Sequence, residues 1–374
     1  MSQIETTPEN ISGDISCTKC HNPYPNQGLP HRCPVCNGLF DYTTWPAFHL
    51  SHVDLHAPGI WKFRDSFGLP AKAPKITLGE GSTPLVWRNA LGRELAFKLE
   101  FLNPIGSFKD RGIALLISFL LSRGVDRAVE DSSGNAGASF AAYATSVGLQ
   151  ACVYIPDYAS GPKRTQIEAY GAQVIPIPGS RSNTTEAVLC AVDEGAIYAS
   201  HACLPFTLPG YATVAYELFQ EMREPPGSVV VPTGQGGLLL GIGRGFIALK
   251  NAGLIDRIPK LVGVQAQACA PLWAEFHNGA IGLSLVSEGE TLAEGVRIMN
   301  PLRSDAILQL LSRTGGLIIA VEESKILPGS DALARLGFYV EPTSAVVWNA
   351  LEQVIEDLPD PVVVILTGSG LKTP

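Results

Sequence analysis

The sequence has few charged residues, no membrane-length apolar run and no excess of basic side chains. Only 17% of its 374 residues are charged, while 46% are hydrophobic, a composition typical of a compact globular protein rather than a disordered one. The longest apolar run, IALLISFLL, is about half as long as a membrane-spanning helix. The formal net charge of −8 argues against the basic surface that nucleic acids and acidic membranes require. We therefore expect neither a nucleic-acid partner nor a membrane partner.

The first residues also lack the basic start and the apolar segment of a secretory signal. The segment MSQIETTPENISGD at 1–14 is polar and slightly acidic, so we expect a cytoplasmic protein. Disulfides are rare in that compartment. The eight cysteines are therefore interpreted as thiols or metal ligands.

Four of the cysteines are regularly spaced. CTKC at 17–20 and CPVC at 33–36 form two Cys-x-x-Cys knuckles, and two such knuckles complete a tetrahedral sulfur site. The pattern predicts that Cys17, Cys20, Cys33 and Cys36 bind a structural zinc ion, with iron as the alternative metal. Because four protein ligands leave no open coordination position, we expect the metal to hold the fold rather than to act in chemistry.

Strand-like and helix-like segments alternate from residue 95 onward. Apolar, β-rich runs such as ACVYIP, SVVVPTG, KLVGVQA and PVVVILTG lie between alanine- and leucine-rich stretches such as ASFAAYATSVG, GYATVAYELFQEM and SAVVWNALEQVIEDL. This alternation predicts an α/β fold with parallel sheets that helices cover on both faces. In such sheets ligands bind at the carboxyl ends of the strands. The length predicts two or three domains.

One lysine lies in an unusual setting, in NPIGSFKDRG at 103–112. Ser107 and Asp110 fit a capping box, which predicts that a helix begins here. Lys109 then lies in the first turn, where the helix dipole opposes a cation. An amine that is less protonated can act as a nucleophile or form a Schiff base. A merely exposed structural lysine is the alternative that this stretch leaves open.

Three glycine-containing strings follow predicted strands: EDSSGNAGASF, PTGQGGLLLG and LTGSGLK. Glycines at such positions let backbone amides converge on an anion at the start of a helix. TGQGG at 233–237 is the densest, and Leu239 replaces the third glycine of a dinucleotide fingerprint. One phosphate is thus favoured over a dinucleotide, and a tight packing turn is the alternative. A Schiff-base lysine with one phosphate nest suggests pyridoxal phosphate.

These motifs resemble, in order, those of the tryptophan-synthase-β family of pyridoxal-phosphate enzymes (fold type II), and within it threonine synthases and their relatives. The matching segments cover about residues 75–374 and are GEGSTPL at 79–85, NPIGSFKDRG at 103–112, SSGNAG at 132–137, TGQGG at 233–237, EPTSA at 341–345 and LTGSGLK at 366–372. The cysteine segment resembles the zinc ribbon of some threonine-synthase-like proteins. The resemblance also favours a homodimer.

The resemblance implies a fold and its division. We expect an α/β protein with two parallel-sheet, three-layer domains of the tryptophan-synthase-β type, the cofactor between them, and a small N-terminal zinc-ribbon-like segment. The implied division is 1–58 for the ribbon and connector, 59–102 with 214–374 for the larger cofactor-binding domain, and 103–213 for a smaller, mobile substrate domain.

The resemblance also implies residue roles. Lys109 matches the lysine that holds pyridoxal phosphate as a Schiff base and moves protons on the substrate. Asn135 matches the residue that hydrogen-bonds the phenolic oxygen of the cofactor, and Thr367 the hydroxyl that faces its pyridine nitrogen. The phosphate nest corresponds to Gly234, Gln235, Gly236 and Gly237. Substrate contacts are implied for Ser132, Ser133, Ala136, Thr83 and Lys163.

These roles indicate a pyridoxal-phosphate-dependent lyase that acts on a small amino acid. A neutral hydroxyl at Thr367 makes the ring a weaker electron sink, which suits elimination and replacement. The resemblance to threonine synthases implies that O-phosphohomoserine and water give threonine and phosphate. The segment PDYASGPKRTQIEAYGA supplies Lys163 and Arg164 for a substrate phosphate, although Tyr158 stands near the place of an earlier family lysine. The alternatives are a serine/threonine dehydratase-like ammonia-lyase, a β-replacement synthase, and a non-catalytic zinc-ribbon binding protein.

Overall fold

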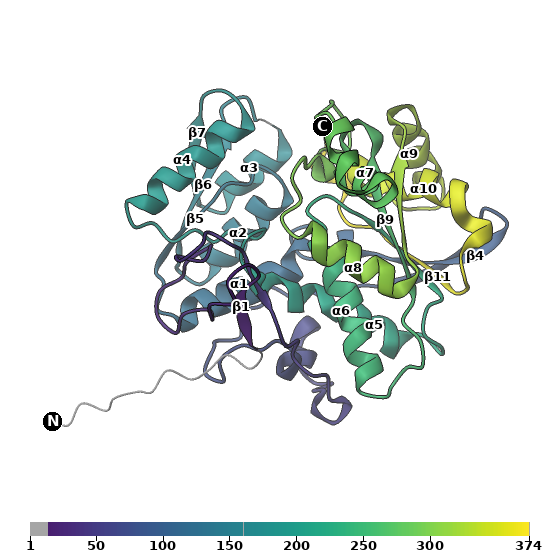
Figure 1. The fold of residues 1–374 in the computed structure, drawn as a ribbon, viewed down its shortest axis with the longest axis horizontal. Coiled ribbons are helices and arrows are strands. Elements are labelled where there is room, and N and C mark those ends of the chain that lie inside the picture. The colour runs from purple at the N-terminus through teal and green to yellow at the C-terminus, as the bar shows by residue number, and fades with distance from the viewer. Residues whose placement is uncertain (1–13, 160, 374) are drawn as a thin grey trace.

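The computed structural model describes residues 14–159 and 161–373, which fold into two α/β lobes and a small N-terminal ribbon (Figure 1). The expectation of no secretory signal concerns residues 1–14, and all but the last of these lie outside the described residues. In the described part of the chain, no helix is both long and apolar enough to span a membrane. The strands are β1 Ile15–Cys17, β2 Phe40–Tyr42, β3 Leu85–Ala90, β4 Arg93–Lys98, β5 Arg127–Glu130, β6 Gln150–Pro156, β7 Gln173–Ile177, β8 Ser228–Pro232, β9 Lys260–Ala266, β10 Leu317–Val321 and β11 Val362–Ile365.

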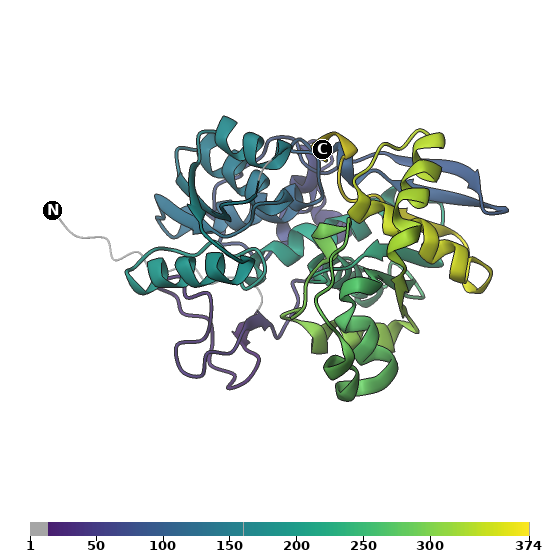
Figure 2. The same cartoon turned by 90° about the horizontal axis from the view of Figure 1, so that it is seen from above.

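The helices connect these strands and cover the sheets (Figures 1 and 2). The α-helices are α1 Lys109–Ser122, α2 Asn135–Ser146, α3 Pro162–Ala169, α4 Arg181–Asp193, α5 Leu208–Glu221, α6 Gly237–Asn251, α7 Pro271–Asn278, α8 Ser304–Thr314, α9 Ile326–Arg335 and α10 Pro342–Val354.

The large lobe is built on a six-stranded sheet in the order β10-β9-β8-β11-β4-β3. Its strands are parallel except β3, which pairs antiparallel with β4 as an edge hairpin. The central strands are fully buried, so they have continuous apolar sequences. Val229 and Val231 of β8 face the core under α5 and α6, while Val230 faces the core formed with α10. This alternation places helices on both faces, as predicted.

The small lobe is built on the three parallel strands β5-β6-β7. Ala128 and Val153 face the core formed with α1 and α2, whereas Val129 and Cys152 face Val188 of α4. Helices thus cover both faces of this sheet too. The two three-layer lobes confirm the predicted fold class.

The N-terminal ribbon contacts both lobes. The ring of Tyr24 lies 6.3 Å from that of Phe119 on α1 and 5.2 Å from that of Phe206. On the large lobe, the Asp41 carboxylate accepts two hydrogen bonds of 2.7 and 2.8 Å from Arg244 of α6. Arg303 donates to the Phe40 carbonyl at 3.1 Å. The ribbon is therefore packed into the same core that joins the lobes.

The predicted domain boundary at 213/214 falls inside helix α5, which spans Leu208–Glu221 without a break. Glycines of α6 let that helix approach α5 closely: a Cβ at Gly241 would lie 2.6 Å from Cβ of Tyr211, and one at Gly245 would lie 2.7 Å from the Ala212 carbonyl. The predicted boundary therefore divides a helix that packs against α6 of the large lobe.

Candidate active site

Lys109 begins helix α1 at the junction of the two lobes. The loop before it pairs with the end of the large sheet, since Phe108 N–H donates to the Thr367 carbonyl at 3.0 Å and Ser107 forms a β-bridge with Gly368. The predicted capping box of Ser107 and Asp110 does not form. The Asp110 carboxylate instead accepts from Ile105 N–H at 2.8 Å, and no side chain caps the helix. The loop geometry, rather than a cap, fixes Lys109 beside the end of β11.

The amine of Lys109 is in an environment that weakens its charge. Burial lowers the pKa of Lys109 to about 8, against the opposite influence of the Glu130 and Glu341 charges. The aromatic ring of Phe108 lies 5.0 Å from Nζ. A half-buried lysine whose pKa is lowered holds more free amine at neutral pH than an exposed lysine does, and the free amine is the nucleophilic form.

Asn135 begins helix α2 and connects the small lobe to Glu341 of the large lobe. Its Nδ2 donates to both carboxylate oxygens of Glu341, at 2.9 and 3.0 Å. Lys163 of α3 also reaches Glu341, with Nζ 3.4 Å from Oε2. Asn135 Oδ1 is buried and has no partner within the described residues. Glu341 therefore gathers two of the predicted site residues from the small lobe.

Thr367 lies two residues after the end of β11, at the carboxyl end of the large sheet. Its N–H donates to the Ser344 hydroxyl at 2.8 Å, and the side chain is buried. Its Oγ1 has no hydrogen-bond partner in the part of the chain that the structure describes. A buried hydroxyl without a partner is unfavourable, so this atom is available to a ligand.

The glycine-rich loop 233–237 connects β8 to α6, again at the carboxyl end of the sheet. Gly236 has φ of +75° and precedes the first residue of α6, so it provides the left-handed turn that aims backbone amides outward. A Cβ here would lie 2.1 Å from Cδ1 of Ile307, and one at Gly234 would lie 2.6 Å from the Gly295 carbonyl. Gln235 accepts from Leu302 N–H at 3.1 Å. The loop is thus tightly enclosed.

Tyr211 of α5 connects this loop to α1. Its ring lies 5.3 Å from that of Phe108. Cβ atoms built on Gly112 and Gly237 would lie 2.6 and 3.5 Å from this ring. The turn that carries Lys109 and the start of α6 therefore pack on the same side chain.

The predicted carboxylate-binding loop lies between β5 and α2. Ser132 and Ser133 are half-buried, and Ala136 is buried in the first turn of α2. A Cβ at Gly137 would lie 1.7 Å from the Ser132 carbonyl, so only glycine lets the loop fold back on the helix. The loop contributes hydroxyls and the N-terminus of α2 to the same junction.

The hydroxyl of Thr83, which the resemblance assigns to substrate contact, is engaged within the chain in this structure. Its hydroxyl is buried, donates to Glu100 at 2.6 Å and accepts from Arg111 at 3.1 Å. Arg111 is fully buried and also binds Glu100 and Glu217 at 2.6–2.8 Å. The sequence reading missed this network, which explains the position: Thr83 completes the shell of a buried guanidinium.

The four predicted metal ligands come together. The Sγ atoms of Cys17, Cys20, Cys33 and Cys36 all lie within 4.8 Å of one another, and they form the only such cluster found among the described residues. A Cβ at Gly38 would lie 2.6 Å from Cys17 Sγ, so glycine lets the second knuckle close on the first. Four thiols at this spacing fit a tetrahedral metal with sulfur ligands.

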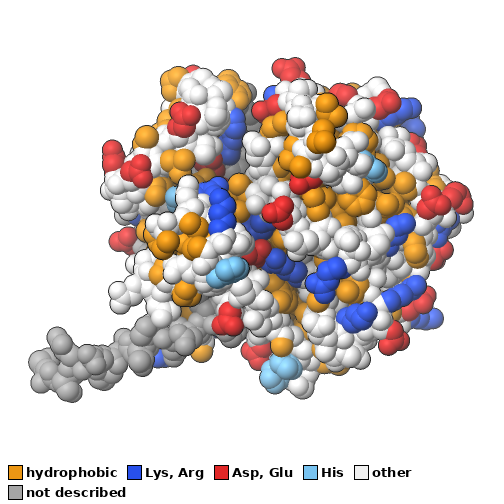
Figure 3. Space-filling model, viewed as in Figure 1, with side chains coloured by type: hydrophobic (Ala, Val, Ile, Leu, Met, Phe, Trp, Pro, Cys, Tyr) orange, Lys and Arg blue, Asp and Glu red, His pale blue; other side chains and the backbone are white. Residues whose placement is uncertain are grey.

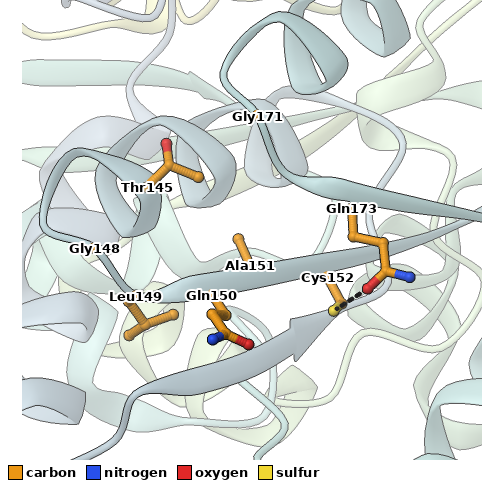
Figure 4. Close-up of a pocket in the computed structure, with 8 residues that line it drawn as sticks. All are labelled: Thr145, Gly148, Leu149, Gln150, Ala151, Cys152, Gly171 and Gln173. Carbon is orange, nitrogen blue, oxygen red and sulfur yellow. Dashed lines mark hydrogen bonds between the residues drawn. The ribbon is translucent and has the colours of Figure 1, made fainter.

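A hollow of about 360 Å³ lies on the small lobe, lined by residues such as Thr145, Gln150 and Gln173 (Figure 4). Gln173 accepts from the Cys152 thiol at 3.2 Å. The hollow lies where β6 and β7 begin. Ligands in parallel sheets bind at the opposite, carboxyl ends, so this hollow is separate from the candidate active site.

The space-filling view shows a cleft between the two lobes (Figure 3).

Two titratable residues near Lys109, Glu130 and His201, were not predicted from the sequence. Glu130 ends β5 and is fully buried, and His201 Nδ1 lies 2.7 Å from its Oε1. The available signal for Glu130 was an acidic residue that follows the apolar pair Ala128 and Val129. The sequence offered no signal for His201, which is 71 residues away.

Comparison with known proteins identifies the class. A family model described as pyridoxal-phosphate dependent enzyme matches residues 76–368. The chain belongs to this family and is a pyridoxal-phosphate-dependent enzyme.

Two threonine synthases are similar to this chain over most of its length. The threonine synthase of Methanocaldococcus jannaschii is 32% identical over 96% of this chain and 92% of its own length. The threonine synthase of Synechocystis sp. is 33% identical over 83% of this chain and 82% of its own length. Among solved structures, the T.th. threonine deaminase is 27% identical, with a TM-score of 0.65 over 77% of this chain and 92% of its own. Maize serine racemase shares the fold. It is 22% identical, with a TM-score of 0.66 over 77% of this chain and 88% of its own.

The residues at the junction fit pyridoxal phosphate. Lys109 offers an amine of lowered pKa for the aldehyde. The turn at Gly236 offers amides and a helix N-terminus, which together suit a phosphate. Thr367 Oγ1 and Asn135 Oδ1 are buried polar atoms without partners in the described chain. These groups come from both lobes and converge where the sheets end.

Replacing Gly236 with alanine should weaken binding of pyridoxal phosphate at least tenfold, about 1.4 kcal/mol. The new Cβ overlaps Ile307 and shifts the loop amides. Titration of the cofactor by absorbance measures this effect. Gly253→Ala is the matched control, because Gly253 has φ of +71° but no atom within 4 Å of its Cβ position; it should destabilise folding by about 1–2 kcal/mol and leave affinity unchanged. The double variant Gly236→Ala/Ile307→Val should recover affinity. Equal affinity in Gly236→Ala and wild type would contradict the proposed nest.

Proposed function

We propose that this enzyme is a threonine synthase, which converts O-phosphohomoserine and water to threonine and phosphate. The observation that carries the proposal is the meeting of Lys109 with two further lysines, Lys163 and Lys372, around Glu341. The 32% identity to a threonine synthase over nearly the whole chain supports it.

The roles of this chain's residues follow from their positions. When bound, pyridoxal phosphate supplies an electron-accepting ring that stabilises charge on the substrate carbon next to the amino group. Lys109 would hold the cofactor, and its Nζ, when free, would accept and return protons. Thr367 would present a neutral hydroxyl to the ring nitrogen, and the side-chain amide of Asn135, whose Nδ2 here donates to Glu341, would hydrogen-bond the phenolic oxygen. Ser132 and Ser133, at the start of α2, hold the substrate carboxylate.

A phosphorylated substrate requires cations at the same junction. Lys163 is partly exposed and lies 3.4 Å from Glu341. Lys372 donates to the Ile105 carbonyl at 2.7 Å, and its electrostatic partners include Asp110, Glu341 and Lys163. Arg164 is held instead by Glu168, at 2.9 Å on the exposed side of α3. We therefore expect Lys163 and Lys372 to bind the substrate phosphate. The sequence alone had assigned this role to Lys163 and Arg164.

An ammonia-lyase acting on serine or threonine is the second candidate. The likeness to the T.th. threonine deaminase favours it. Both activities use the same cofactor chemistry and differ in what holds the side chain of the substrate. The exposed Tyr158, in place of an earlier cation, fits an unphosphorylated substrate better.

Purified enzyme should release phosphate and threonine from O-phospho-L-homoserine faster than it releases ketoacid from serine or threonine. Lys163→Ala should raise KM for the phosphorylated substrate at least tenfold, because a charge-assisted hydrogen bond contributes about 1.5–3 kcal/mol. Arg164→Ala is the matched control and should change KM less than about twofold, because Glu168 already holds its guanidinium. Ketoacid release from serine or threonine without phosphate release from O-phosphohomoserine would establish the ammonia-lyase instead.

We also propose that the ribbon cysteines hold one zinc ion, and that the enzyme is a cytoplasmic homodimer. The thiol cluster supports zinc, whereas the compartment and the dimer rest on the sequence resemblance. The zinc would hold the ribbon against both lobes through Tyr24 and Asp41, and its closed shell of four thiols would leave no position for a substrate.

Chelation of the zinc should lower the melting temperature by several degrees and reduce activity at about 25 °C less than twofold while the chain stays folded, since a closed sulfur site contributes to folding. Cys20→Ser should act likewise. Cys190→Ser is the control, because Cys190 is also exposed but lies outside the cluster. Protein purified without chelator that contains no zinc and unfolds at the same temperature as Cys20→Ser would refute the site.

A further inference from the structure

Arg303 lies just before α8, and its side chain joins three parts of the chain. The guanidinium is buried. Its Nη2 donates to the Phe40 carbonyl of the ribbon at 3.1 Å and to the Cys203 carbonyl at 2.9 Å, and its Nη1 donates to the Ala202 carbonyl. Its Nε lies 3.7 Å from Asp41 Oδ2, also in the ribbon. One side chain of the large lobe is thus fixed to the ribbon (purple in Figure 1) and to the segment before α5.

The backbone around Arg303 contacts the glycine-rich loop that precedes α6. Leu302 N–H donates to Gln235 Oε1 in this loop at 3.1 Å. Ile307 lies in the first turn of α8, where its N–H donates to the Arg303 carbonyl at 3.0 Å. A Cβ on Gly236 would lie 2.1 Å from Ile307 Cδ1, so the Ile307 side chain packs directly on the turn of the loop. The segment that carries the guanidinium therefore also holds the loop.

The ribbon holds the helix that follows the loop as well. Helix α6 begins at Gly237 and carries Arg244. The two Nη atoms of Arg244 donate to Asp41 at 2.7 and 2.8 Å, and its guanidinium lies 5.2 Å from the centre of the Trp45 ring. Asp41 therefore pairs with arginines from both elements that border the loop, α6 and the segment before α8.

The contacts of Arg303 fix its position more closely than apolar packing would. A guanidinium is planar and presents five N–H donors in a rigid fork, so several acceptors in fixed places determine both where it lies and how it is turned. Three of its acceptors are backbone carbonyls, which move only with their own segments. A glutamine at this position has two N–H donors and no charge. It could therefore not satisfy the same set of acceptors.

We propose that Arg303 is a positioning residue for the cofactor phosphate. It fixes the start of α8 against the ribbon and the segment before α5. The start of α8, through Leu302 and Ile307, then holds the loop at 233–237 in the conformation that aims its amides at the phosphate. The ribbon thereby supports cofactor binding through Phe40 and Asp41. The inference rests on the proposed phosphate-binding role of the loop, and it does not depend on which amino acid the enzyme uses.

Comparison of pyridoxal phosphate with pyridoxal, the same aldehyde without phosphate, tests this role. Arg303→Gln should weaken the affinity for pyridoxal phosphate at least about tenfold, the low end of what the loss of a supporting contact costs around metal ligands, and that for pyridoxal less than about twofold. Both affinities are measured on the full-length chain freed of cofactor, from the concentration dependence of borohydride trapping. A general loss of stability would weaken both alike, so the ratio of the two affinities reports on the phosphate alone.

Arg93→Gln is the matched control. Arg93, on β4, also donates to two backbone carbonyls, those of Ile355 and Leu358, and also pairs with an aspartate, Asp360. These partners lie outside the ribbon and the glycine-rich loop. Arg93→Gln should therefore lower the melting temperature, as Arg303→Gln does, and leave the ratio of affinities unchanged.

Gly236→Ala, which alters the loop itself, separates failure of this inference from failure of the loop assignment. Both Gly236→Ala and Arg303→Gln should lower the ratio. A folded Arg303→Gln chain with the wild-type ratio, beside a lowered ratio in Gly236→Ala, would overturn the role of Arg303 and leave the loop assignment standing. A wild-type ratio in both variants would overturn both.

Asp41→Asn tests the same connection even if Arg303→Gln fails to fold. The change removes the charge that pairs with Arg303 and Arg244 but keeps an oxygen acceptor. The ratio of affinities should fall in the same direction, by about threefold or more, because a hydrogen bond to a charged group contributes more than one to a neutral group. A folded Asp41→Asn chain with the wild-type ratio would contradict the proposal.

Discussion

The buried ion pairs of Arg111 hold the helix that presents Lys109. Arg111 lies two residues beyond Lys109 and binds Glu100, just after β4, and Glu217, on α5. Removing one partner of such a buried pair costs about 3–5 kcal/mol, because the other charge is left without compensation. The first turn of α1 is therefore fixed to the large lobe, although most of the helix packs in the small lobe. The position of Lys109 depends on this network.

A lysine at this junction is partly deprived of solvent and is flanked by acidic residues from both lobes. Glu130 comes from the small sheet and Glu341 from the segment before α10. Their charges favour the ammonium form, burial opposes it, and the balance leaves the pKa of Lys109 at about 8. The junction thus both positions this lysine and lowers its pKa.

The sequence predicted what depends on local pattern. Buried parallel strands have continuous apolar sequences, so β8 and β11 were evident, and the loop at Gly236 was recognisable from its glycines. Contacts between distant segments could not be predicted from the sequence. The antiparallel β3 is an exposed edge strand without a clear apolar pattern, the Thr83 hydroxyl is engaged by Arg111, and His201 meets Glu130 only through the path of the chain beside β5. The capping box failed because a backbone amide competed for Asp110.

The central claim is that Lys109, among the lysines gathered at the junction, carries the cofactor. The most direct test is borohydride reduction of the enzyme as purified, followed by peptide mapping of the pyridoxyl group. The label should be found on Lys109 alone. A label on Lys163 or Lys372, which also lie at the junction, would contradict the account.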